Sequence, residues 1–268
     1  MNHAPVRRYA YKYSIFEVLI DTFYMLIEIA VFNLESAILA AHAGAHRIEL
    51  CSSPAEGGLT PSPATMRLAR KYIKIPIHVM IRPREGDFCY SEKEFETMLL
   101  DVAAAKMVGM EGIVAGILNP DGTIDKERTS ILVDAAAPMN VTFHRAFDMT
   151  SDLCQALEDI INSGCSRILT SGGHQSAHEG IDNLTGLVKK AGTRILIIPG
   201  SGVNQDNIKR IADTTGAIEM HLSARSFIPG RMSFKKQQVT MGGHVVIPDF
   251  EIQLPDETVI RNILKLFP

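Results

Sequence analysis

The stretch Arg47–Ser62, RIELCSSPAEGGLTPS, decides the fold. In its first half, apolar residues alternate with Glu49 and Cys51, and this period of two predicts a β-strand with one apolar face. A proline and a glycine pair then end the strand and predict a loop. A carboxylate and a thiol therefore share one face of a strand just before a glycine loop, which is typical of a functional site rather than of a core.

The same unit of strand, loop and helix recurs along the chain from Met25 onward. Strands are predicted at 26–32, 47–52, 75–82, 112–118, 140–147, 167–171, 194–199 and 219–225, and helices at 33–43, 62–72, 91–108, 126–136, 151–163, 178–191 and 204–215. Eight strands alternating with helices imply parallel pairing and predict an α/β fold, a (β/α)8 TIM barrel. A doubly wound open sheet is the alternative, but its strands are more uniformly apolar because helices cover both faces.

Two segments fall outside this pattern. Residues 1–24 are predicted to be an N-terminal extension, disordered or docked on the surface, ahead of a single barrel domain at 25–268. Ser226–Pro255 shows no clear helical period and predicts a long irregular segment before a closing helix at 257–267. Such a segment usually forms a lid or an interface, so we expect a homo-oligomer.

Composition argues against several classes of protein. A formal net charge of −3 over 268 residues gives no electrostatic footprint for nucleic acid or an anionic membrane. No apolar run approaches the roughly 18 residues that a membrane span needs. The four cysteines are scattered and form no CxxC pair, which predicts a reduced, cytoplasmic protein.

The two faces of the predicted strands differ in chemistry. One parity is apolar and should face the helices, as Ile48 and Leu50 do in the second strand. The other parity should line the lumen, and it carries Glu28, Glu49, Cys51, His78, Arg82, His144, His221, Ser223 and Arg225. Uncompensated buried charge costs several kcal/mol per ion, so these residues form either a site or a self-satisfied ion-pair network. The network alternative has most weight for Glu28, which begins its strand.

Glycine-rich loops follow the sixth and seventh strands, the latter directly before a predicted helix. Glycine lets backbone N–H groups approach an anion, and barrels often bind phosphate at this corner. The predicted site for a phosphate, sulfate or carboxylate comprises Gly172, Gly173, Gly200, Ser201, Gly202 and Arg225. The alternative is that these glycines only form tight turns.

Seven segments, in this order, closely resemble the copper homeostasis protein CutC family: RIELCSSPAEGGLTPS, IPIHVMIRPREGDFCYS, GILNPDGTID, VTFHRAFDM, LTSGGHQSA, IIPGSGVN and EMHLSARS. The resemblance runs from about Met25 to the C-terminus and includes every strand end, whereas Met1–Tyr24 is not part of it. It implies a cytoplasmic (β/α)8 barrel that binds copper as Cu(I) and contributes to copper tolerance or trafficking.

Cu(I) prefers thiolate and thioether ligands, with imidazole acceptable. The predicted metal ligands are Cys51, on the lumen side of its strand, and Cys89, if the loop that carries it folds over the mouth of the barrel. Met80 and His78 lie on the strand between them. Cys154 and Cys165 are interpreted as core residues.

An enzyme is the opposing class of function. If the protein is an enzyme, the predicted catalytic residues are Glu49, His78, Arg82, His144, Arg145 and Asp148, which offer acid, base and electrostatic roles at strand ends. An isomerase, lyase or hydrolase of a sugar or sugar-phosphate-like anion would use such groups. Glu49, His78 and His144 could also hold a divalent metal. No GxGxxG, Walker or HExxH motif is present.

Overall fold

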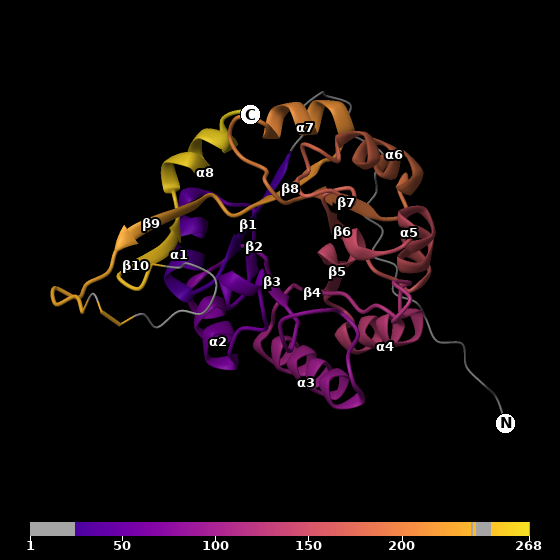
Figure 1. Ribbon diagram of the computed structural model, residues 1–268, viewed down its shortest axis with the longest axis horizontal. Helices are drawn as coiled ribbons and strands as arrows, with labels where there is room; N and C mark the ends of the chain where they lie inside the picture. Colours follow the sequence, from indigo (N-terminus) through magenta and orange to yellow (C-terminus); the bar gives the residue numbers. More distant parts are fainter. Residues whose placement is uncertain (1–24, 237, 240–247, 268) are drawn as a thin grey trace.

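The computed structural model describes residues 25–236, 238–239 and 248–267. Within these ranges, a central ring of strands is surrounded by helices (Figure 1). The predicted extension at 1–24 lies outside the described residues. No helix in the described part of the chain has both the length and the apolar character needed to cross a membrane.

Eight parallel strands form the ring. They are β1 (Leu26–Val31), β2 (Arg47–Leu50), β3 (Ile77–Met80), β4 (Gly112–Ala115), β5 (Asn140–Phe143), β6 (Arg167–Thr170), β7 (Leu196–Pro199) and β8 (Glu219–Leu222). Hydrogen bonds join them in the order β7-β6-β5-β4-β3-β2-β1-β8, and β8 also contacts β7, so the ring is nearly closed. The predicted (β/α)8 barrel is confirmed.

The outer layer consists of helices, most of which begin at a residue whose side chain caps the first turn. The helices are α1 (Leu34–Ala43), α2 (Pro63–Tyr72), α3 (Glu92–Val108), α4 (Lys126–Ala136), α5 (Leu153–Asn162), α6 (Ile181–Ala191), α7 (Ile208–Thr215) and α8 (Glu257–Leu264). Of these, α6 and α7 lack such a cap. Asn33 caps α1 by accepting a hydrogen bond from the Ser36 backbone N–H. Ser91 and Glu94 form the predicted capping box of α3.

Alternate side chains along the strands point to opposite sides of the ring, as the sequence pattern predicts. Ile48, Leu50 and Val79 are fully buried in the core between strands and helices. Inside the ring, Cys51, Met80 and Val114 form a small apolar cluster of their own. Most of the other side chains inside the ring are polar or charged, and their positions define the site described below.

Several strands are shorter than predicted, and two of the corrected element boundaries lie near the predicted site. The fifth strand ends at Phe143 instead of running to Phe147, and the 3-10 helix η2 (Arg145–Met149) begins immediately after His144. The ring of His144 causes this turn, because its Nδ1 accepts a hydrogen bond from the Ala146 backbone N–H. The seventh helix begins at Ile208 instead of residue 204.

The segment between the eighth strand and the last helix is more regular than the sequence predicts. It contains an antiparallel pair, β9 (Arg225–Pro229) and β10 (Glu251–Pro255), which stands outside the barrel (Figure 1). The Gln253 carbonyl of β10 accepts hydrogen bonds from Asn33 and Ser36 at the start of α1. The pairing of β9 with β10 gives the backbone N–H and C=O groups of this segment hydrogen-bond partners, although the segment contains no helix.

Candidate functional site

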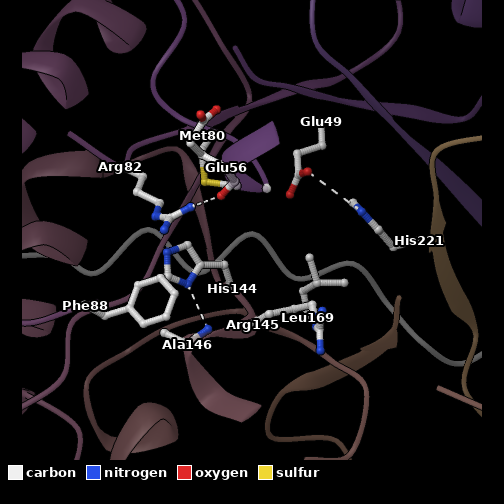
Figure 2. Close-up of a pocket in the computed structure, with 11 residues that line it drawn as sticks. Glu49, Glu56, Met80, Arg82, Phe88, His144, Arg145, Ala146, Leu169 and His221 are labelled. Atoms are coloured by element: carbon white, nitrogen blue, oxygen red, sulfur yellow. Dashed lines mark hydrogen bonds and ion pairs between the residues drawn. The ribbon is translucent and has the colours of Figure 1, made fainter. Parts of the chain in front are cut away.

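A cavity of about 220 Å³ opens at the carboxyl ends of the barrel strands. Its lining residues come from β2, β3, β6 and β8 and from the loops that follow β2, β3 and β5: Glu49, Glu56, Gly57, Met80, Arg82, Phe88, His144, Arg145, Ala146, Leu169 and His221. Figure 2 shows Glu49 and His221 on one wall and Arg82, Phe88 and His144 on the opposite wall. Acidic and basic groups thus face each other across a small space.

A layer of ion pairs lies below the cavity. Arg47 forms ion pairs with Glu28 and, at 2.6 Å, with Glu219, which is also 3.0 Å from Arg167. Arg47, Glu28 and Glu219 are buried. Glu28 therefore belongs to a self-satisfied network of buried ion pairs, which was one of the two alternatives for the polar lumen residues. Arg47, Glu219 and Arg167 were not singled out from the sequence, although Arg47 has the same strand parity as Glu49.

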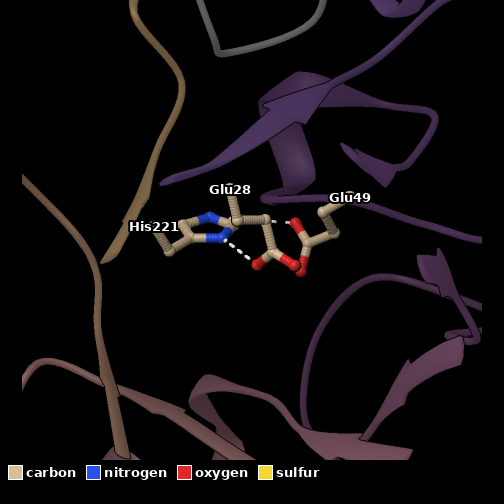
Figure 3. A group of neighbouring side chains, drawn as sticks. All are labelled: Glu28, Glu49 and His221. Carbon is tan, nitrogen blue, oxygen red and sulfur yellow. Dashed lines mark hydrogen bonds and ion pairs between the residues drawn. The ribbon is translucent and has the colours of Figure 1, made fainter. Parts of the chain in front are cut away.

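His221 connects this layer to the cavity. Its Nδ1 lies 2.8 Å from Glu28 Oε1 and its Nε2 lies 3.8 Å from Glu49 Oε2 (Figure 3). Burial opposes the charged imidazole, but the Glu49 and Glu28 carboxylates outweigh it and raise the pKa of His221. Burial also raises the pKa of Glu49. This histidine between two carboxylates can hold and relay a proton.

His144 lines the cavity beside Arg82 (Figure 2). Since Nδ1 accepts the Ala146 N–H, the ring proton of the neutral imidazole lies on Nε2, which is buried and has no partner among the described residues. Burial and the nearby Arg82 charge lower the pKa of His144 to about 3. The ring fits because Gly116 lacks a side chain: a Cβ there would lie 2.5 Å from His144 Nδ1. His144 is thus a neutral hydrogen-bond donor.

His78 lies deeper and away from the cavity lining. Its ring occupies the space over Gly112 of β4, where a Cβ would lie 2.5 Å away. Burial lowers the pKa of His78 to about 3, so the ring is neutral. His78 is therefore the neighbour of Glu49 in the register of β2 and β3 but does not line the cavity.

Arg82 is buried without a carboxylate partner in the described part of the chain. Its guanidinium donates hydrogen bonds to the carbonyls of Glu56, Gly58 and Gly86, and no described residue accepts a hydrogen bond from its Nε. These bonds tie the loop after β2, which includes the short 3-10 helix η1 (Pro54–Glu56), to the loop after β3. The charge itself remains unneutralised at the cavity wall.

The Asp148 carboxylate lies at the glycine loop after β6, where the sequence predicts a bound anion. It accepts hydrogen bonds from the Ser171 and Gly173 backbone N–H groups and forms an ion pair with Arg145 at 2.8 Å. Gly172 donates its own N–H to the Thr170 hydroxyl. Asp148 is therefore the internal anion of this loop, and it positions Arg145 at the cavity rather than touching the cavity itself.

The remaining residues of the predicted anion site are not assembled around one point. The Gly200 N–H donates to the Thr170 carbonyl, and Gly200 makes room for Leu169 and His221. The helix N-terminus that was expected beside Gly202 lies at Ile208. Arg225 belongs to β9 and is exposed, because β8 ends at Leu222 before the chain leaves the barrel.

The predicted sulfur ligands occupy different surroundings. Cys51 is buried beside Met80, and its thiol donates to Glu49 Oε2 at 3.5 Å. Burial and the neighbouring carboxylate raise the pKa of Cys51 well above its usual value. Cys89 is half-buried in the loop after β3, and Phe88, not Cys89, lines the cavity. Cys165 is buried, as expected for a core residue, whereas Cys154 is exposed.

One cluster among the described residues has the spacing of a metal site. Donor atoms of Glu28, Glu49 and His221 lie within 4.8 Å of one another (Figure 3). It differs from the trio expected from the sequence, because Glu28 and His221 stand in place of His78 and His144. Its oxygen donors suit hard cations rather than Cu(I), and Arg47 already neutralises Glu28. Cys51 and Met80 carry the thiol and thioether donors that a soft metal prefers.

Fold and site together define a (β/α)8-barrel protein with a small polar cavity at the carboxyl ends of its strands. Residues 25–226 match the model of the CutC family, and the chain belongs to that family.

The chain is 46% identical to the family protein CutC of Mesorhizobium japonicum, over 88% of this chain and 91% of that protein. It is 43% identical to the human protein named copper homeostasis protein cutC homolog, over 89% of this chain and 87% of that protein. It is also similar to the CutC crystal structure from Streptococcus agalactiae, with a TM-score of 0.70 and 33% identity over 74% of this chain and 97% of that one.

Proposed function

We propose that this protein acts in copper homeostasis by binding Cu(I) as a cargo ion at Cys51 and Met80. The family membership supports this role, since relatives that cover most of the chain are named copper homeostasis proteins. A buried free thiol that binds Cu(I) requires a reducing compartment, so the proposal places the protein in the cytoplasm. Copper tolerance or trafficking is the corresponding cellular role.

The observation that carries the proposal is the pairing of two soft donors at the end of neighbouring strands. The Cys51 Sγ lies 3.2 Å, and the Met80 methyl carbon 3.5 Å, from the point where a Cβ on Gly58 would lie. Gly58 has a φ of +109°, which glycine adopts without strain. The glycine loop therefore packs closely against a thiol and a thioether, which are the ligand types that Cu(I) prefers.

The neighbouring carboxylate gives the thiol a route for losing its proton. Cu(I) binds the thiolate, so the Cys51 proton must leave when the metal enters. Glu49 Oε2 already accepts that proton in a hydrogen bond, and burial raises the pKa of Glu49. Because the raised pKa of Cys51 favours the thiol, copper affinity should increase as the pH rises.

The experiment is a competition titration against a Cu(I) chelator under reducing conditions. Cys51→Ser should abolish tight binding, and Met80→Leu, which conserves volume, should weaken it. Cys89→Ser tests whether the loop after β3 supplies a further ligand. Cys154→Ser, which removes an exposed thiol, is the matched control and should bind like the wild type. Full stoichiometry and affinity in Cys51→Ser would refute the proposal.

A further inference from the structure

Three residues that line the cavity each carry a buried polar atom that has no hydrogen-bond partner among the described residues. These atoms are Glu49 Oε1 at the end of β2, Arg82 Nε after β3 and His144 Nε2 after β5. Glu49, Arg82 and His144 are only 4%, 8% and 4% exposed. Most buried polar groups have a hydrogen-bond partner, so three such atoms on residues that line one cavity indicate a polar occupant. The copper pair accounts for none of these three atoms.

The charges of the cavity define the polarity of that occupant. Arg82 has no acidic partner among the described residues, and the Arg145 guanidinium, tethered to Asp148, is 42% exposed at the mouth. These two cations favour an anionic group on the occupant. Across the cavity, Glu49 and His221 form an acidic wall (Figure 2). The occupant therefore needs a negative group at one end and a proton to exchange at the other.

The cavity is also small. Its volume of about 220 Å³ lies below the roughly 300–1,000 Å³ of pockets that hold drug-sized ligands. Phe88 and Leu169 provide apolar surface between the polar walls. These dimensions suit a compound of a few carbons rather than a polymer or a nucleotide.

We propose that the cavity binds a small anionic hydroxycarbonyl compound and that Glu49 exchanges the proton on the carbon next to its carbonyl. The His144 Nε2–H donates to the carbonyl oxygen, and Arg82 and Arg145 attract the carboxylate or phosphate group. This activity goes beyond the proposed copper role and requires no metal.

The chemical step is an enolisation. The Glu49 carboxylate takes the α-proton, the C–H bond breaks, and its electron pair shifts to form the enolate, whose oxygen accepts the His144 Nε2–H hydrogen bond. Reversal returns a proton from Glu49 to the same carbon. His221, 3.8 Å from Glu49 Oε2, allows the proton on Glu49 to exchange before it returns. The cycle leaves every atom and electron balanced and needs no co-reactant.

The experiment measures loss of the α-proton signal by NMR in deuterated buffer, with copper-free protein. Hydroxypyruvate carries a carboxylate, dihydroxyacetone phosphate carries a phosphate, and dihydroxyacetone is the neutral comparison. We expect exchange above the protein-free rate for at least one anionic probe and a slower rate for the neutral one. Glu49→Gln should lower the rate by about 10²-fold or more, as for loss of a general base. His144→Asn should lower it by about 10²-fold, as for loss of an oxyanion donor.

Glu96→Gln on the exposed face of α3 is the matched control and should keep the wild-type rate. Melting temperatures show which variants are folded. The proposal is overturned if no probe exchanges above the protein-free rate, if a folded Glu49→Gln keeps the wild-type rate, or if the neutral probe exchanges fastest. Because the copper titration measures a different property, either proposal can fail while the other stands.

Discussion

Replacing Glu28 by glutamine should destabilise the barrel from within. Glu28 and Glu219 together neutralise Arg47, and Glu219 also serves Arg167. In Glu28→Gln, two guanidinium groups share one buried carboxylate. The substitution changes the shape of the side chain very little, so its effect reports on charge. It also removes the carboxylate that holds His221 Nδ1 at 2.8 Å.

The magnitude follows from burial. Glu28 and Arg47 are only 1% and 2% exposed, and breaking a buried pair by removing one partner costs about 3–5 kcal/mol. One kcal/mol corresponds to roughly 2–4 °C in melting temperature for chains of 150–250 residues, so a decrease on the order of 10 °C is expected. In Glu28→Gln with Arg47→Met, Glu219 keeps Arg167 and the charges balance again. Most of the lost stability should return.

The pH dependence provides an independent check. Burial acts to raise the pKa of Glu28, but Arg47 and His221 outweigh it and hold that pKa well below its usual range. A depressed folded-state pKa adds stability above the unfolded value of about 4.3, and this stability is lost as the pH falls through the folded-state pKa. The part of the stability difference between wild type and Glu28→Gln that comes from the titration of Glu28 itself should therefore shrink in solutions more acidic than about pH 5. Glu28 also helps to raise the pKa of His221, and the stability from that contact should be lost as the pH rises through the pKa of His221.

Urea unfolding of the wild type, both single variants and the double variant completes a double-mutant cycle. A destabilisation by Glu28→Gln of less than about 0.5 kcal/mol, the range of ordinary surface substitutions, would refute the reasoning. So would a cycle in which the Glu28 and Arg47 substitutions are additive, because independence would mean that the buried pair contributes nothing.

Two further substitutions test the geometry of the cavity wall. Gly116→Ala places a methyl group 2.5 Å from His144 Nδ1 and should cost about 1–3 kcal/mol by overpacking, whereas Gly186→Ala in α6 meets no neighbour and should not destabilise; thermal unfolding compares the two. Asp148→Asn loses a charged acceptor of backbone N–H groups and releases Arg145, so urea unfolding should show a loss of about 1–3 kcal/mol.

The barrel and much of its lumen could be predicted from the sequence because both follow from local periodicity. Alternation along β2 places Glu49 and Cys51 inside the ring, and the same argument extends to Arg47, which the prediction omitted. The prediction that Arg225 lines the lumen was wrong, because the alternation of faces holds only while a strand continues and β8 ends three residues earlier.

The partners of the site residues could not be predicted, because they join positions far apart in the chain. Nothing in the spacing of residues 148 and 173 indicates that the Asp148 carboxylate fills the glycine loop intended for a ligand. Likewise, the room for His144 comes from Gly116 on the neighbouring strand. Such contacts depend on register between strands, which hydrophobic periodicity does not specify.

The buried layer of Arg47, Glu28 and Glu219 also has a kinetic consequence. Within the described residues, it fills the amino end of the barrel below the cavity, whose lining residues lie toward the carboxyl ends of the strands. Arrival and departure through the described part of the barrel would then share the carboxyl end. An occupied cavity excludes the next molecule until the first has left, and the residence time of one occupant sets the rate at which the next is admitted.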